Sequence, residues 1–155
     1  MWTFAGHAYL KLGNLDDSLL CTRTAVSQDP SLPDTWSLYG ELSEAQALKT
    51  DEILAYYDKA LALHSTHVPS LVGSGRVLYK AGRLALALHH LTTAVSVDEH
   101  NPAAWLELGR VYRALGEPTT ASDCLLRAFN EGRQSPVRPF AANWALHSGA
   151  DAWAL

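Results

Sequence analysis

Apolar and small residues recur at the spacing of one helix face in residues 101–128. Two groups of such residues lie three or four positions apart, which places each group on one side of an α-helix. They are Trp105, Leu108, Gly109 and Tyr112 in the first group, and Ala121, Leu125 and Ala128 in the second. Gly116 between the groups suits the end of a helix. The pattern predicts two antiparallel helices that share an apolar face.

The same pattern recurs with a period of about 34 residues, which indicates an internal repeat. One period earlier its positions are Gly75, Gly82, Ala87, Leu91 and Ala94. The unit before that has Trp36, Gly40, Tyr57 and Ala60, with one extra residue between its helices. The chain begins with Trp2, Gly6, Tyr9, Gly13, Ser18, Ala25 and Pro30 at the same positions. Because one helix pair cannot bury its apolar face alone, the repetition predicts a stacked array.

The Trp, Leu-Gly, Tyr and Ala positions of residues 101–128 resemble those of the tetratricopeptide repeat. This resemblance implies an all-α fold, a right-handed superhelical solenoid of helix-turn-helix repeats. Within residues 1–135 we expect four repeats, at about 1–32, 33–67, 68–101 and 102–135. The first is expected to be truncated at its start, because Trp2 normally stands several residues into the first helix. Three residues are expected to cap helix N-termini, namely Asn14, Thr50 and Asn101.

Residues 136–155 differ from the repeats and are expected to form a C-terminal tail. Pro136 and Pro139 interrupt the last repeat helix. The sequence beyond them is rich in alanine, almost uncharged, and carries Trp144 and Trp153. Two interpretations remain open: a short capping helix over residues 141–147, or an alternative end unrelated to the repeats.

Charge and cysteine content narrow the class of protein. The formal net charge of −4 argues against nucleic-acid binding, since nucleic-acid-binding domains are normally basic. Cys21 and Cys124 take equivalent places in the first and last units, too far apart for a disulfide, which needs Cα atoms within about 7 Å. We therefore expect two free thiols and a cytoplasmic protein. No apolar run approaches the ~20 residues that a membrane-spanning helix needs, so no direct membrane insertion is expected.

Catalytic and metal-binding patterns are weak in this sequence. His64 and His67 are three residues apart but fall in a predicted turn with no third ligand nearby, so a surface loop is favoured over a metal site. No Ser/His/Asp grouping, phosphate-binding glycine loop or paired carboxylate signature stands at a meaningful spacing. We expect no enzyme activity, no cofactor and no metal.

Exposed residues of each first helix are expected to line the inner, concave wall of the superhelix. By register these are Thr3, His7, Ser37, Glu41, Val72, Arg76, Lys80, Leu106, Arg110 and Arg113. The candidate partner-binding residues among them are Arg76, Lys80, Arg110, Arg113, Glu41 and His7. Guanidinium groups suit carboxylate or phosphate contacts, so the basic strip of Arg76, Lys80, Arg110 and Arg113 predicts an acidic partner segment. The alternative is that these cations pair with Glu107, Glu117 or solvent.

Two stretches narrow the resemblance within the repeat family. LYKAGRLALA at residues 78–87, and Asp123-Cys124-Leu125 followed by SPVRPF at 135–140, are similar to the C-terminal array of the tetratricopeptide repeat protein 7 family. That resemblance covers about residues 2–140. It implies a cytosolic scaffold that brings a phosphatidylinositol 4-kinase to the plasma membrane, with a membrane-anchor protein and an adaptor as partners. The family's long N-terminal helical region is absent from this sequence.

Two functions remain open. The first is a protein–protein interaction scaffold that binds a partner segment on the concave face, within such a kinase-recruiting complex or another one. The second is a regulatory repeat domain of another assembly, including one that binds calmodulin, as plant relatives of the family are linked to calmodulin. The basic stretches are sparse and embedded in the array, whereas a basic amphipathic helix is typical of calmodulin targets.

Overall fold

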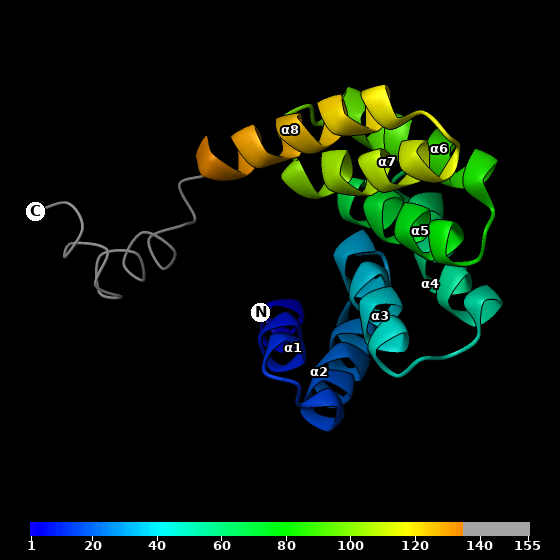
Figure 1. The fold of residues 1–155 in the computed structure, drawn as a ribbon. Coiled ribbons are helices and arrows are strands. Elements are labelled where there is room, and N and C mark those ends of the chain that lie inside the picture. Colours follow the sequence, from blue (N-terminus) through cyan, green and yellow to red (C-terminus); the bar gives the residue numbers. More distant parts are fainter. Residues whose placement is uncertain (135–155) are drawn as a thin grey trace, which may run out of the picture.

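The computed structural model describes residues 1–134, which fold into eight α-helices (Figure 1). The helices are α1 (Trp2–Lys11), α2 (Leu15–Gln28), α3 (Pro33–Ala45), α4 (Thr50–Leu63), α5 (Val68–Lys80), α6 (Leu84–Val97), α7 (Pro102–Ala114) and α8 (Pro118–Gln134). They contact one another most extensively as antiparallel pairs: α1 with α2, α3 with α4, α5 with α6, and α7 with α8. Each pair is called a unit below, with a first and a second helix.

The turn inside each unit has the same backbone geometry. Gly13, Gly82 and Gly116 follow the first helix with φ between 78° and 83°, the left-handed region that glycine adopts without strain. The next amide closes a six-residue hydrogen-bonded ring, as Arg83 N does to the carbonyl of Leu78 at 2.9 Å. This is the Schellman arrangement, which satisfies the last carbonyls of a helix. It reverses the chain sharply enough to make the two helices antiparallel.

The second unit makes the same turn without glycine. Ala47 takes the position of those glycines with φ 55°, and Leu48 N donates to the carbonyl of Ser43 at 3.1 Å. A left-handed conformation costs a residue with a Cβ about 1–2 kcal/mol. The extra residue predicted for this unit follows Ala47, so the turn runs on to Lys49 before α4 begins.

Two of the three predicted N-caps are correct. The side-chain oxygen of Asn14 accepts a hydrogen bond from the amide of Asp17, and that of Asn101 accepts from Ala104. Thr50 was wrong as a cap: it is the first residue inside α4, and Lys49 precedes it without a side-chain hydrogen bond. The register of the third unit agrees with this, since Arg83 precedes Ala87 by four residues as Lys49 precedes Ile53.

The units stack into an arc, the right-handed solenoid that the sequence predicts (Figure 1). Each first helix contacts the next one: α1 with α3, α3 with α5, and α5 with α7. Within residues 1–134 the second helices make no comparable contacts with one another. The first helices therefore line the inner, concave side of the arc and the second helices lie outside. Among these residues no helix is both long and apolar enough to cross a membrane.

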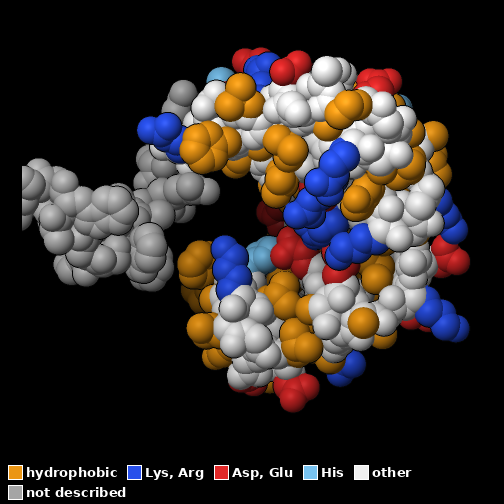
Figure 2. Space-filling view, in the orientation of Figure 1, with side chains coloured by type: hydrophobic (Ala, Val, Ile, Leu, Met, Phe, Trp, Pro, Cys, Tyr) orange, Lys and Arg blue, Asp and Glu red, His pale blue; other side chains and the backbone are white. Residues whose placement is uncertain are grey.

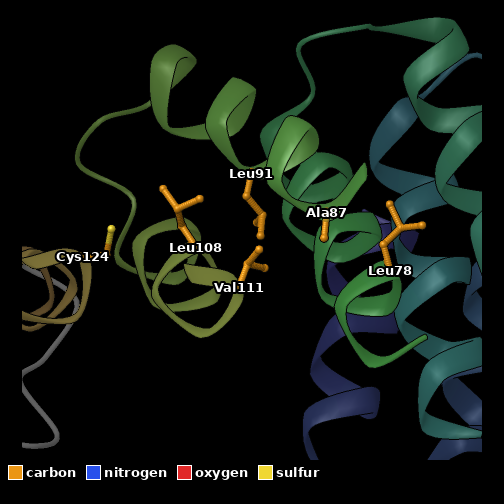
Figure 3. Close-up of a cluster of buried hydrophobic side chains, with 6 residues drawn as sticks. All are labelled: Leu78, Ala87, Leu91, Leu108, Val111 and Cys124. Atoms are coloured by element: carbon orange, nitrogen blue, oxygen red, sulfur yellow. The ribbon is translucent and has the colours of Figure 1, made fainter. Parts of the chain in front are cut away.

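Consecutive units share their apolar core. Leu78, Ala87 and Leu91 of the third unit pack with Leu108, Val111 and Cys124 of the fourth (Figure 3). Ala87, Leu91 and Val111 are fully enclosed. Because this cluster is made from two units, neither could bury it alone. Cys124 is a free thiol here, as is Cys21 in the first unit, and both are buried.

Glycine permits a close approach around Tyr57, a fully buried side chain of α4. A Cβ added at Gly40 would lie 2.6 Å from the Tyr57 ring, and one added at Gly73 would lie 2.5 Å from it. The ring is therefore held between α3 and α5, first helices of consecutive units. This contact fixes the hydroxyl of Tyr57, which matters for the concave surface.

Candidate functional site: the concave surface

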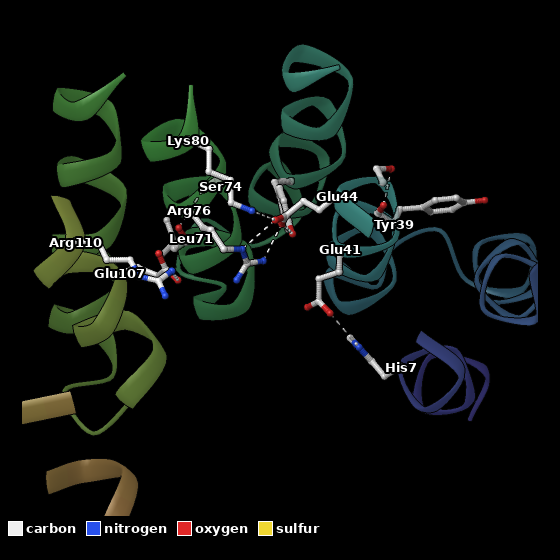
Figure 4. A network of polar contacts seen from close by, with 12 residues as sticks. His7, Tyr39, Glu41, Glu44, Leu71, Ser74, Arg76, Lys80, Glu107 and Arg110 are labelled. Atoms are coloured by element: carbon white, nitrogen blue, oxygen red, sulfur yellow. Dashed lines mark hydrogen bonds and ion pairs between the residues drawn. The ribbon is translucent and has the colours of Figure 1, made fainter. Parts of the chain in front are cut away.

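Glu44 is the centre of a polar network on the concave surface (Figure 4). Its carboxylate lies near the end of α3 and accepts two hydrogen bonds from Arg76 of α5, at 2.9 Å from Nε and 2.7 Å from Nη2. Tyr57 donates a third at 2.6 Å, and Nζ of Lys80 lies 3.8 Å away. A carboxylate held by a two-pronged guanidinium contact and a phenol has a fixed position.

Burial strengthens this network. The Glu44 side chain is 13% exposed and that of Arg76 is 28% exposed. The hydrogen bonds to Glu44 raise the pKa of Arg76 above its usual range, so its charge is permanent. Burial, and then the nearby charge of Glu44, raises the pKa of Tyr57, so its phenol keeps its proton. The three groups join the second unit to the third.

A second acidic residue lies on the neighbouring helix α7. Arg110 donates a 3.0 Å hydrogen bond to Oε1 of Glu107, whose side chain is only 7% exposed. Oε2 of Glu107 is buried and has no hydrogen-bond partner within the described residues. The negative charge of Glu107 also raises the pKa of Arg76. Arg76 lies between Glu107, which is buried, and Glu44, which is partly buried (Figure 4).

At the other end of the concave surface, Nδ1 of His7 in α1 lies 3.5 Å from Glu41 in α3. Both side chains are about one-third exposed. Arg113, in the last turn of α7, is exposed, and the described part of the chain holds no ion pair of this residue. The six candidate residues thus fall into two groups: the His7–Glu41 pair on α1 and α3, and four cations on α5 and α7.

The depth of the charged groups decides what this surface presents to a partner. The carboxylate of Glu107 is buried and that of Glu44 is 13% exposed, whereas Lys80 is 64% exposed and Arg110 is 42% exposed. Figure 2 shows Lys and Arg side chains over acidic ones on the wall of the hollow that the arc encloses. Although acids and bases are interleaved, the outermost layer is cationic.

Two expectations about the inner wall need correction. Ser37 and Val72 were expected to be exposed there, but they are 1% and 6% exposed, because these helix positions face the core. The alternative, that the cations pair with Glu107, Glu117 or solvent, holds in part: Arg110 pairs with Glu107 and Arg113 is exposed, whereas Arg76 and Lys80 lie beside Glu44. Sequence reasoning missed Glu44; its only signal was an acid and a base 32 residues apart, close to one repeat.

The structure also forms a Ser/His/Asp grouping that the sequence spacing did not reveal. His67 contacts Asp34 through Nε2 at 2.6 Å and Ser70 through Nδ1 at 2.7 Å. Asp34 and His67 are 33 residues apart, so the grouping forms only when two units stack. Ser70 is fully buried and cannot meet a substrate. The grouping instead ties the start of α5 to the start of α3. Within residues 1–134 no three metal-ligating side chains gather in one place.

Comparisons with known proteins agree with this architecture. Two family models described as tetratricopeptide repeat match residues 5–67 and 78–142. Tetratricopeptide repeat protein 7B of Homo sapiens is 31% identical over 140 residues, 90% of this chain and 16% of that protein. Protein NPGR1 of Arabidopsis thaliana is 29% identical over 141 residues, again 90% of this chain and 20% of that protein. The chain thus spans less than a quarter of the length of either relative.

Solved structures share the fold at lower sequence identity. A chain of the APC/C hetero-tetramer Cut9–Hcn1 superposes with a TM-score of 0.78 and 21% identity, over 93% of this chain and 28% of that one. Pseudomonas aeruginosa PilF gives 0.77 and 23%, over 87% of this chain and 61% of that one. The repeats, their stacking and these matches lead to one conclusion. The chain belongs to the tetratricopeptide repeat family of non-enzymatic protein–protein interaction scaffolds, and it resembles tetratricopeptide repeat protein 7B.

Proposed function

We propose that this chain binds an acidic, extended or helical segment of a partner protein along its concave surface. Arg76, Lys80, Arg110 and Arg113 provide the contacts, and the His7–Glu41 pair borders the surface at its α1 end. The observation that carries the proposal is the depth of the charges: Lys80 and Arg110 are more exposed than the carboxylates of Glu44 and Glu107. A partner carboxylate meets the cations first and need not displace an exposed acid.

The four cations do not contribute equally. Arg76 is already held by Glu44 through two hydrogen bonds, so its main role is to keep the network in place. Lys80 and Arg113 are exposed and keep donors free for a partner. Several cations acting together bind an anion more strongly than isolated exposed ion pairs, which contribute about 0–1 kcal/mol each.

The resemblance to tetratricopeptide repeat protein 7B suggests which assembly this scaffold serves. We infer a cytoplasmic complex that recruits a phosphatidylinositol 4-kinase to the cytoplasmic face of the plasma membrane, with a membrane-anchor protein and an adaptor as co-partners. In that role the chain contacts proteins and not the lipid bilayer. The support is the match over 90% of this chain; the rest of that relative is not represented in it.

The concave-surface proposal is tested with a fluorescent peptide of alternating Glu and Ser residues and with a matched Lys and Ser peptide. Fluorescence anisotropy should show binding of the acidic peptide only. Its affinity should weaken from about 0.05 M to about 0.3 M salt, because the screening length falls below about 10 Å in this range. Lys80→Glu combined with Arg113→Glu should abolish binding. Equal binding of both peptides would contradict the proposal.

A charge-matched control separates the concave surface from net charge. Lys49→Glu combined with Arg83→Glu makes the same charge change in the turns between helices, where the one ion pair that Arg83 forms within residues 1–134 is the exposed pair with Asp51. This variant should bind the acidic peptide like the wild type. The purified kinase, anchor and adaptor complex, captured on immobilised variants, then tests the assembly. Capture of calcium-loaded calmodulin in its place would favour the regulatory alternative.

A further inference from the structure

The two acidic residues beside Arg76 differ in how completely their oxygens are hydrogen-bonded. Glu44 uses both oxygens: Oε1 accepts from Tyr57 and from Nη2 of Arg76, and Oε2 accepts from Nε of Arg76. Glu107 uses one oxygen: Oε1 accepts from Arg110 at 3.0 Å, whereas Oε2 is buried and has no hydrogen-bond partner within residues 1–134. The described side chains therefore complete the bonding of one carboxylate and leave that of the other incomplete.

Oε2 of Glu107 differs from the other buried side-chain oxygens that have no partner in the described part of the chain. Those are Oγ1 of Thr35 and Oγ of Ser37, which belong to neutral hydroxyl groups. A carboxylate oxygen is charged, and burying a charged group without a hydrogen bond is costly. Because the Glu107 side chain is only 7% exposed, contact with bulk water compensates little of this cost. A hydrogen-bond donor that reaches Oε2 should therefore bind favourably.

A partner segment on the concave surface would lie beside this oxygen. Arg110 of the same helix pairs with Glu107 on one side, and Arg76 of α5 lies on the other (Figure 4). The Arg110 side chain is 42% exposed and that of Arg76 is 28% exposed. Exposed side chains change rotamer within nanoseconds, so these arginines can turn aside and admit a donor without movement of the helix backbone. Since Glu107 is recessed, a long side chain is needed to reach it.

The surroundings of Glu107 favour a neutral donor over a cationic one. Arg76 and Lys80 lie beside Glu44, and Arg110 pairs with Glu107. An ammonium or guanidinium group of a partner would meet like charges here, which repel it. A side-chain carboxamide avoids this repulsion and can form two hydrogen bonds. Its N–H donates to Oε2 of Glu107, and its oxygen accepts from Arg110, which has further N–H donors beyond the one bonded to Glu107.

We propose that Glu107 and Arg110 together bind the side-chain carboxamide of a glutamine in the partner segment. The inference rests on the proposed function, because it takes the acidic segment as given and adds a second requirement. Acidic residues of the segment contact the exposed cations Lys80 and Arg113, and a neighbouring glutamine enters between Arg76 and Arg110. Glu107 thus selects among acidic segments, since a segment without a carboxamide leaves Oε2 unpaired.

Two acidic peptides test the inference on the wild-type full chain by fluorescence anisotropy. One peptide alternates Glu with Gln. The other alternates Glu with a glutamine whose side-chain nitrogen carries two methyl groups, which keeps the charge and the carbonyl oxygen but removes the N–H donors. Because the alternation places a carboxamide beside every Glu, the result does not depend on how the peptide aligns. The unmethylated peptide should bind about tenfold more tightly, the usual effect of one hydrogen bond to a charged group.

Two variants show whether Glu107 causes this preference. Glu107→Met removes the acceptor and should make the affinities of the two peptides equal. Since the two peptides carry the same charge, the ratio of their affinities does not respond to the altered net charge of the protein. Glu41→Met is the matched control, because it removes a carboxylate of the same surface that is about one-third exposed, and it should keep the preference. Circular dichroism verifies that both variants are folded.

The outcomes separate this inference from the proposed function. Equal binding of the two peptides by the wild type would overturn the inference alone, and this comparison needs no folded variant. A preference that survives Glu107→Met, or one that is lost equally in Glu41→Met, would also overturn it. If neither acidic peptide binds to the wild type, the proposed function fails and the inference fails with it.

Discussion

The hydroxyl of Tyr57 donates a 2.6 Å hydrogen bond to Oε1 of Glu44, 13 residues earlier in the chain. The bond joins the buried face of α4 to the concave surface, because the carboxylate of Glu44 also receives Arg76 from the next unit. One side chain thus belongs both to the apolar core and to the charged surface. Substitutions in the core around Tyr57 should therefore also alter the positions of Glu44 and Arg76 on the proposed binding surface.

Tyr57→Phe should lower the free energy of unfolding by about 1–3 kcal/mol, the usual cost of a hydrogen bond lost to a charged, partly buried group. Urea denaturation followed by circular dichroism measures the effect. Tyr56→Phe is the control, because Tyr56 is only half-buried and donates no hydrogen bond within residues 1–134; its effect should stay below about 0.5 kcal/mol. Equal losses in the two variants would show that the contact with Glu44 contributes nothing.

Gly73→Ala should destabilise the array more than Gly109→Ala. A Cβ at Gly73 would lie 2.5 Å from the enclosed ring of Tyr57, whereas one at Gly109 would lie 3.0 Å from Cγ and Cδ2 of Leu125 and 3.2 Å from the backbone oxygen of Ala121. Overpacking costs about 1–3 kcal/mol, while alanine gains about 1 kcal/mol over glycine inside a helix. Thermal unfolding should place Gly73→Ala well below the wild type; the reverse order would contradict the packing around Tyr57.

Ala47→Gly should stabilise the protein by about 1 kcal/mol, since it removes the strain of a left-handed alanine. The φ of 55° at this residue is the reason. Gly82→Ala is the reciprocal variant: it introduces the same strain into the third unit and should cost about 1–2 kcal/mol. Differential scanning calorimetry of both variants would check the pair. A lower melting temperature for Ala47→Gly would argue against this turn geometry.

His90 should make the protein less stable in mild acid. Its ring is half-buried in α6 and lies 2.6 Å from the hydroxyl of Ser74. Burial, and then the charge of His89, lowers the pKa of His90, although Asp58 acts in the opposite direction. The unfolded chain, with its histidine pKa near about 6.5, then binds the proton more readily than the folded one. The stability is complete above that pH and is lost as the pH falls.

The measurement compares urea denaturation at about pH 7.5 and about pH 5.5, on either side of the histidine pKa in the unfolded chain. His90→Gln should lose less stability on acidification than the wild type, because the titrating group is gone. His64→Gln removes an exposed histidine of a turn and serves as control. If His90→Gln and the wild type lose the same stability, His90 is not the responsible group.

The repeats were predictable because small residues at fixed spacing determine how closely helices pack. Gly75 and Ala94 have a glycine and an alanine as counterparts at the same positions of the other units, and this period is visible in the sequence. The network around Glu44 was not predictable in this way. It depends on the stacking that brings the end of α3 beside the middle of α5. The spacing of 32 residues between Glu44 and Arg76 is close to one repeat, but it does not show how deep the two side chains lie or that they face each other.

The turn at Ala47 was predictable only in part. The extra residue was visible as a longer spacing from Gly40 to Ile53, but the sequence did not show that an alanine would adopt the left-handed conformation. The cap predicted at Thr50 lies one residue too late, because Lys49 takes the position before α4. The positions of a repeat can therefore be predicted where the period is regular, whereas the backbone conformation at a local insertion is seen only in the structure.

The position of the apolar clusters has a mechanical consequence. They are built from α4 to α8, and the cluster of Figure 3 holds the third and fourth units together. In α1, by contrast, only Gly6 is buried. Because each unit is stabilised mainly by its neighbours, the first unit should open at a lower free energy than the last. Under a pulling force the array should therefore unfold in steps. We expect α1 to detach first, while α5 to α8 remain folded.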